Sequence, residues 1–290
     1  MRDTIQINEA TLRKLRIRTS YQTALNAYRA RTRLARVSWV TWLLTGGTIL
    51  LWCITATKIA QATGAHDIRA ILINIVNSAI NSAINVQNND TVTTILVAYG
   101  AKDNTLILQG QYWRFITPIF LHVNALHVGL NMLNLVILGV FLERLFGHLR
   151  FLLIYLITGI IAVIASFYFA PQEISVGASG AIFGLVGAYS IFVLVHRQAF
   201  PRGGIPALFW LLIIIALNLS IGFFVSNVDN YAHLGGLLSG CLLGWIFTPL
   251  YRLSAGNVLF DTHALIRSWP LALVTIAGML ALAILALHFT

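Results

Sequence analysis

The sequence predicts an all-α polytopic membrane protein, a bundle of six transmembrane helices with one extra helix at the C-terminus. Of its 290 residues, 58% are hydrophobic and only 10% are charged, whereas soluble domains average about 25% charged residues. The apolar residues form several stretches of the roughly 20 residues that a helix needs to cross the hydrocarbon layer. Short polar connections separate these stretches, so we expect the chain to cross the membrane repeatedly.

Residues 1–36 precede the first apolar span and are strongly basic. They hold nine of the 19 Lys and Arg residues of a chain whose net charge is +10. A basic block beside a first span is typical of a cytoplasmic N-terminus, and direct binding of anionic lipid is a weaker alternative. We therefore expect a basic cytoplasmic tail, and this placement of the charge argues against nucleic acid as a partner.

The first transmembrane helix is expected at 37–60, and an outer loop follows at 61–117. Within this loop, residues 68–86 repeat apolar side chains at i, i+3, i+4 and i+7, which is typical of an amphipathic helix. The opposite face is a continuous row of Asn and Ser, too polar to cross lipid. We expect this helix to lie in the membrane interface, and a docking surface for substrate is a weaker alternative.

The core of the bundle is expected at 118–250 and contains transmembrane helices 2–6. The five apolar spans are Ile119–Leu142, Phe151–Ala170, Ala178–His196, Ile205–Val225 and Tyr231–Leu250. A cytoplasmic connection at 251–268 and a seventh transmembrane helix at 269–290 follow. Arginines lie in the short inner connections, whereas the outer connections at 171–177 and 226–230 contain no Lys or Arg. This distribution predicts a cytoplasmic N-terminus.

Two spans carry glycine patterns beside reactive side chains. Gly180 and Gly184 form a G-x-x-x-G pair next to Ser179, and such a pair lets another helix approach closely. In the sixth span, His233 is followed by Gly236 and Gly240 at i+3 and i+7, on the same helix face. We predict that these two faces pack together and bring Ser179, a residue type that can act as a nucleophile, next to His233, a residue type that can act as a base.

The second span carries further polar side chains at a similar depth. His122, His127 and Asn131 all lie in its outer half, and His127 and Asn131 share a helix face. Polar groups inside a membrane are costly and usually face the bundle or a hydrated cavity. Since Ser179 and His233 also lie near the outer ends of their spans, we expect one hydrated cavity that opens outward.

These residues suit serine chemistry. A serine hydroxyl becomes a good nucleophile when a neighbouring base takes its proton, and histidine has a suitable pKa. A tetrahedral intermediate needs preorganised donors, which an Asn amide, an imidazole and the backbone N–H of Ser179 would supply. No span holds a free Asp or Glu at that depth, so the expected catalytic unit is a Ser179–His233 dyad.

With these residues in view, the chain resembles the rhomboid family of intramembrane serine proteases, over about 100–250. Five blocks carry the resemblance: Trp113-Arg114, His122 with His127-x-x-x-Asn131, Glu143-Arg-Leu-Phe-Gly147, Gly177-Ala-Ser179-Gly180, and Ala232-His233-x-x-Gly236-x-x-x-Gly240. The resemblance implies that Ser179 is the nucleophile and His233 the general base and acid. It also implies an oxyanion hole made by His127, Asn131 and the Ser179 amide.

The remaining motif residues are expected to support this site. His122 would be structural, hydrogen-bonded to a loop carbonyl, and Trp113 and Arg114 would be architectural. Many relatives have Tyr where this chain has Phe183, one turn after Ser179; the Phe ring could still pack against His233.

The predicted function is therefore an endopeptidase that cuts single-span membrane proteins near the outer face of their transmembrane segments. The alternatives are a catalytically silent rhomboid-like protein that binds clients, and a transporter or channel, although the sequence lacks the repeat symmetry and charged pathway of a transporter.

We expect no cofactor and no metal. A zinc site of His122, His127 and His233 is disfavoured, because an i, i+5 spacing would turn the first two about 140° apart on a helix. Chain length and the short tail favour a bacterial plasma membrane.

Overall fold

The computed structural model describes residues 37–84, 90–197, 200–224, 228–253 and 259–261, together with 270, 273–274 and 277–278. The predicted tail at 1–36 and most of the predicted seventh helix at 269–290 lie outside the described residues. Within the described part, the chain is helical apart from one short β-hairpin. The predicted helical membrane class is confirmed.

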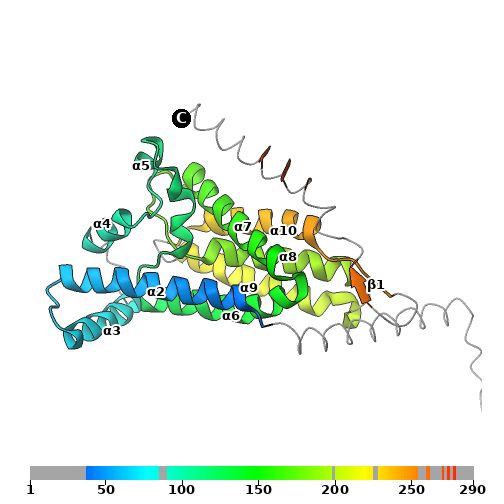
Figure 1. Ribbon diagram of the computed structural model, residues 1–290, viewed down its shortest axis with the longest axis horizontal. Helices are drawn as coiled ribbons and strands as arrows, with labels where there is room; N and C mark the ends of the chain where they lie inside the picture. Colours follow the sequence, from blue (N-terminus) through cyan, green and yellow to red (C-terminus); the bar gives the residue numbers. More distant parts are fainter. Residues whose placement is uncertain are drawn as a thin grey trace, which may run out of the picture.

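The long helices of the described part of the chain run alongside one another in the ribbon view (Figure 1). They are α2 Trp39–Ala62, α6 Ala125–Phe146, α7 His148–Phe169, α8 Ser179–Val195, α9 Ile205–Phe224 and α10 Asn230–Phe247. A helix therefore occupies each of the six positions where a span was expected before residue 251. By length and composition, α2, α6 and α7 are long and apolar enough to cross a membrane. The number of further crossings stays a prediction.

The outer loop contains more structure than the one helix expected from its sequence. Its elements are α3 Ile68–Ile84, α4 Asp90–Ala98, α5 Asn104–Leu108, and two 3₁₀ turns, η1 Tyr112–Phe115 and η2 Thr117–Phe120. These elements lie at the end of the bundle where α2 finishes and α6 begins (Figure 1). The elements other than α3 are too short to show an amphipathic repeat in the sequence. Only α3 could therefore be expected.

The helix expected from Ile119 begins six residues later, at Ala125. Asn124 lies in the extended region, and its side-chain oxygen accepts a hydrogen bond from the backbone N–H of His127 at 2.8 Å. Asparagine is among the preferred N-cap residues because it satisfies one of the free N–H groups of the first turn. His122 consequently lies in the connection before α6 and not on the helix.

A β-hairpin follows α10. Strand β1 Tyr251–Leu253 pairs antiparallel with β2 Leu259–Asp261, with Tyr251 opposite Asp261. The sequence-based expectation for this region was only a connection, because strands of three residues give no clear alternating pattern.

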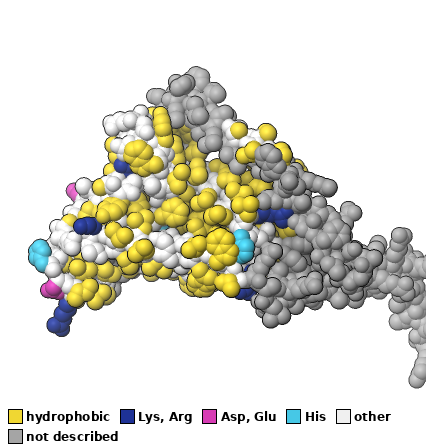
Figure 2. Space-filling view, in the orientation of Figure 1, with side chains coloured by type: hydrophobic (Ala, Val, Ile, Leu, Met, Phe, Trp, Pro, Cys, Tyr) yellow, Lys and Arg dark blue, Asp and Glu magenta, His cyan; other side chains and the backbone are white. Residues whose placement is uncertain are grey.

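Large apolar side chains cover much of the outside of the bundle. In the space-filling view, hydrophobic side chains occupy most of the described surface that faces the reader (Figure 2). Trp42, Leu133, Ile137, Leu238 and Trp245 are all exposed. Soluble monomers rarely expose contiguous apolar surface of this extent, so this surface suits contact with lipid.

The most extensive helix contact joins α8 to α10, and α7 packs against both. Glycines make this contact close. A methyl group added at Gly236 would collide with the backbone carbonyl of Gly180, and one added at Gly240 would collide with that of Gly184. Because the two backbones touch at these positions, side chains at the first turns of α8 and α10 are brought within direct reach of each other.

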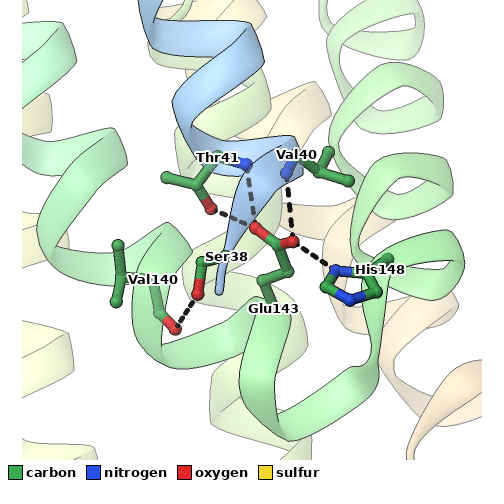
Figure 3. Close-up of polar contacts among 6 residues, drawn as sticks. All are labelled: Ser38, Val40, Thr41, Val140, Glu143 and His148. Carbon is green, nitrogen blue, oxygen red and sulfur yellow. Dashed lines mark hydrogen bonds and ion pairs between the residues drawn. The ribbon is translucent and has the colours of Figure 1, made fainter. Parts of the chain in front are cut away.

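At the opposite end of the bundle, the buried carboxylate of Glu143 joins α6 to the start of α2 (Figure 3). Glu143 is 0% exposed. It accepts hydrogen bonds from the backbone N–H groups of Val40 at 3.1 Å and Thr41 at 2.8 Å, and from the Thr41 hydroxyl. His148 Nδ1 lies within hydrogen-bonding distance of Glu143 Oε1, the oxygen that also accepts from Val40. The first turn of α2 has no side-chain cap of its own from Ser38, so a residue about one hundred positions away supplies it.

Replacing Glu143 by Leu should destabilise the protein, because two backbone donors of α2 and the Thr41 hydroxyl lose their acceptor. Each buried donor left without a partner costs about 1–3 kcal/mol. Glu143→Gln keeps one acceptor oxygen and should lose less. Thermal unfolding in detergent would compare the three proteins, and a Leu variant as stable as the native protein would contradict this account of the contact.

Gly236→Ala should also destabilise the fold, because the new methyl group meets the Gly180 carbonyl and α8 and α10 must separate. Overpacking of this kind costs about 1–3 kcal/mol. Gly47→Ala in α2 is the matched control, since a methyl group there meets nothing within 4 Å and Ala is the better helix former. The same unfolding assay should give a lower melting temperature for Gly236→Ala only; equal melting temperatures would show that the helices do not depend on this contact.

Candidate active site

Ser179 and His233 lie in direct contact at one end of the bundle. Ser179 is the first residue of α8 and His233 is in the first turn of α10. His233 Nε2 is 2.9 Å from Ser179 Oγ, a hydrogen-bond distance. His233 is buried and Ser179 is partly exposed. The hydroxyl therefore has a base beside it and an open side for a reacting molecule.

The start of α8 leaves its backbone donors uncommitted to a side-chain cap. Ala178 is the N-cap residue and provides no side-chain hydrogen bond to the helix. The first N–H groups of a helix have no partner within the helix, and the helix dipole favours negative charge there. The backbone at Ser179 is thus suited to hold a developing oxyanion.

His127 reaches the same small space from α6. An ideal Cβ built on Gly177 would lie 2.9 Å from His127 Nε2 and 3.8 Å from Ser179 Oγ, so the two side chains flank one point. Gly177 has φ +130°, a backbone conformation that favours glycine. A side chain at this position would both strain the backbone and fill the space between Ser179 and His127.

Asn131 follows His127 by one turn of α6 and is buried. Its Nδ2 donates a hydrogen bond to the His127 carbonyl at 2.9 Å. An amide nitrogen carries two hydrogens, so one of them stays available for a second acceptor. The bond to the helix backbone fixes the orientation of the amide group.

His122 contacts a loop amide, and its expected contact with a loop carbonyl stays a prediction. The Ala178 N–H donates to His122 Nε2 at 3.3 Å, and His122 is fully buried. Because His122 precedes α6, the angular argument that separated it from His127 was wrong, and the two rings meet edge to face with centroids 4.9 Å apart. Among the described residues, no group of three or more His, Cys, Asp or Glu could hold a metal ion.

Phe183 stacks on His233. The ring centroids are 4.4 Å apart and the planes are inclined by 12°. Phe183 lies one turn after Ser179 on α8, so the residue that orients the imidazole is on the helix that carries the hydroxyl. An offset stack of this kind restricts the ring to one plane.

Arg114 supports the outer loop and Trp113 lies on its surface. Arg114 Nη1 donates to the carbonyls of Val97 at 2.7 Å and Ala101 at 2.8 Å, and its Nε donates to Gln111. Burial lowers the pKa of the Arg114 guanidinium. Trp113 is 55% exposed. Both residues lie in the 3₁₀ turn η1, away from the contact between Ser179 and His233.

Two residues near the site went unnoticed in the sequence. Lys102 is buried and donates from Nζ to the carbonyls of Ala170 at 2.6 Å and Glu173 at 2.8 Å. Asp229 caps α10 by accepting a hydrogen bond from the Ala232 N–H at 2.9 Å. An Asp just before an apolar helix is a readable N-cap signal, whereas a lysine that binds only backbone carbonyls leaves no pattern in the sequence.

Known proteins share the central part of this chain. A family model described as the Rhomboid domain matches residues 109–250. The rhomboid protease GluP of Bacillus subtilis is 48% identical over 158 residues, which are 54% of this chain and 30% of GluP. RHOMBOID-like protein 6, mitochondrial, of Arabidopsis thaliana is 43% identical over 155 residues, which are 53% of this chain and 50% of that protein.

A third relative is matched over most of its length. The rhomboid-type protein YdcA of B. subtilis is 38% identical over 144 residues, which are 49% of this chain and 71% of YdcA. The chain spans half or less of the length of the first two relatives. The matched region contains all the residues that meet around Ser179, and the family resemblance of their motifs is confirmed: this chain belongs to the rhomboid family.

Proposed function

We propose that this chain is a serine endopeptidase that cleaves transmembrane segments of single-span membrane proteins near the outer face of the membrane. The observation that carries the proposal is the 2.9 Å contact between Ser179 Oγ and His233 Nε2. Similarity to GluP, a rhomboid protease by name, supports the same class of reaction. The bilayer is the medium of the reaction and also its source of substrates.

The proposed reaction begins with proton transfer from Ser179 Oγ to His233 Nε2. The oxygen attacks the carbonyl carbon of the scissile peptide bond, and the carbonyl oxygen becomes negatively charged. Serine alone is a weak nucleophile, and a neighbouring base activates it. The stack of Phe183 on His233 holds the imidazole in the plane that this transfer needs. His233 then gives its proton to the leaving amine, and an acyl-enzyme is left on Ser179.

The oxyanion is proposed to lie beside Gly177 and to be bound by three donors. These are the backbone N–H of Ser179, the imidazole of His127 and the free amide hydrogen of Asn131. Preorganised donors of this kind are often the largest single contribution to catalysis. After the amine product leaves, water attacks the acyl-enzyme and His233 accepts its proton. His233 returns this proton to Ser179 Oγ as the bond to the acyl carbon breaks, and the second product leaves as a carboxylic acid.

The substrate must present an accessible peptide bond. The carbonyl and N–H groups of a transmembrane helix are bonded to each other and shielded, so we propose substrates with Gly or other small, helix-destabilising residues near the cleavage site. In the proposed orientation, the N-terminus is cytoplasmic and the site opens to the outer side.

Ser179→Ala and His233→Ala should each abolish cleavage. The assay is hydrolysis of a fluorescent single-span substrate by purified protein in liposomes. Ser190→Ala is the matched control, because Ser190 lies on the same helix and donates only to the Val186 carbonyl at 2.9 Å. Cleavage that survives Ser179→Ala would rule out the proposed nucleophile. If the native protein cuts nothing and a serine-reactive phosphonate also fails to label Ser179, the chain is a client-binding relative and not a protease.

Asn131→Ala should lower kcat by on the order of 10²–10³-fold, which is the usual cost of losing one oxyanion donor. Asn134→Ala is the control: Asn134 makes the same bond to its own helix, from Nδ2 to the Leu130 carbonyl at 2.8 Å, but is exposed. Single-turnover kinetics on the liposome substrate would measure both variants. A near-native rate for Asn131→Ala would remove it from the oxyanion hole.

A further inference from the structure

The loop 170–178 joins the end of α7 to Ser179 and contains no regular element apart from a single β-bridge. Because Ser179 is the first residue of α8, any shift of this loop also shifts the proposed nucleophile. Two contacts near its end are already part of the candidate site: Gly177 N–H donates to the Pro118 carbonyl at 2.9 Å, and Ala178 N–H donates to His122. The first half of the loop needs a separate anchor.

Lys102 provides that anchor. Its side chain is 0% exposed, and its ammonium donates to the carbonyls of Ala170 at 2.6 Å and Glu173 at 2.8 Å. Its backbone N–H donates to the Ser175 carbonyl at 3.0 Å, and its own carbonyl accepts from the Ser175 N–H at 3.4 Å. One residue of the outer loop therefore holds three points of the segment that leads to Ser179.

Carboxylates favour the charged form of this ammonium. Burial lowers the pKa of Lys102, the carboxylates of Asp229, Glu173 and Asp103 partly offset this effect, and the resulting pKa is about 8. The lysine is therefore mostly charged at neutral pH. Asp229 is the N-cap residue of α10, four positions before His233. The carboxylate that caps α10 thus favours the charged form of Lys102, while the hydrogen bonds of the ammonium go to Ala170 and Glu173.

Packing alone does not account for a lysine here. Moving a charge out of water is costly unless it is paired and hydrogen-bonded, and an apolar side chain would fill the same volume without that cost. Unlike an apolar side chain, the ammonium donates hydrogen bonds. Each of these bonds requires an acceptor at a defined place, so the lysine fixes the positions of its acceptors. Its acceptors are the C-cap carbonyl of α7 and a carbonyl in the loop.

We propose that Lys102 is a positioning residue for the dyad: it fixes the loop 170–178 so that Ser179 meets His233 in reactive geometry. This rests on the proposed function, since the geometry at stake is that of the peptidase reaction. Lys102 itself does not touch the reacting atoms.

The test compares four variants in the liposome assay. Lys102→Met removes the ammonium and keeps the length of the side chain, and Lys102→Arg restores a charged donor. Lys58→Met removes the exposed lysine of α2. Asn104→Leu removes a different hydrogen bond between the same region and α7. Asn104 Nδ2 donates to the Phe167 carbonyl at 2.8 Å, which lies within α7 and not in the loop 170–178.

Lys102→Met should lower kcat by roughly 10- to 100-fold with KM within about two-fold, since a displacement of about 1 Å at the reacting groups has an effect of that size. Lys102→Arg should recover part of the rate. Lys58→Met should match the native protein, and Asn104→Leu should lower the melting temperature with little change in kcat. If Lys102→Met and Asn104→Leu lose kcat equally, or if Lys102→Met keeps the native kcat, the proposal is overturned.

Amide hydrogen exchange of 170–178 separates this proposal from the proposed function. Lys102→Met should speed exchange in this segment, and Lys58→Met should not, whether or not the native protein cleaves the model substrate. Phosphonate labelling of Ser179 in the native protein reports the peptidase chemistry independently. Labelling at the native rate in Lys102→Met, with unchanged loop exchange, would refute the role of Lys102 and leave the peptidase proposal intact.

Discussion

The close approach of α8 and α10 is the constraint on which the rest of the site depends. In lipid, apolar side chains gain nothing from burial against each other, so helices associate through close packing and polar contacts. Gly236 and Gly240 place the backbone of α10 against that of α8, and the hydroxyl and imidazole at the ends of these helices come within 2.9 Å. The contact is short because the glycines remove every side chain that would hold the helices apart.

Two further helices contact this pair. Helix α6 brings His127 beside Gly177, and α7 packs against both α8 and α10. Because Phe183 comes from the same helix as Ser179, the ring that stacks on His233 is fixed to the helix that carries the hydroxyl. The site is thus built from rigid helix ends, and the irregular loop before Ser179 is the one part that requires anchors from elsewhere in the chain.

The features of this arrangement that could be predicted are those that leave a regular spacing of residues in the sequence. The positions of Gly180, Gly184, Gly236 and Gly240 indicated which two helices touch, and hence which serine and histidine could meet. The start of α6 was predicted six residues too early, because hydropathy does not distinguish the apolar turn at 117–120 from a helix, although the Asn124 cap was readable. The role of Lys102 could not be predicted, because its acceptors are backbone carbonyls that any residue type would provide.

Among the described residues, Glu143 and Lys102 are the charged side chains with 0% exposure, and helix ends supply hydrogen-bond partners to both. Glu143 accepts from the N–H groups in the first turn of α2, and Lys102 donates to the carbonyl of Ala170, which caps the end of α7. The sign is correct in each case, since a helix carries partial positive charge at its N-terminus and partial negative charge at its C-terminus. The hydrogen bonds of each charge fix where the partner helix begins or ends. Because Ser179 and His233 also lie at helix ends, the positions of helix ends are the geometry that this site depends on.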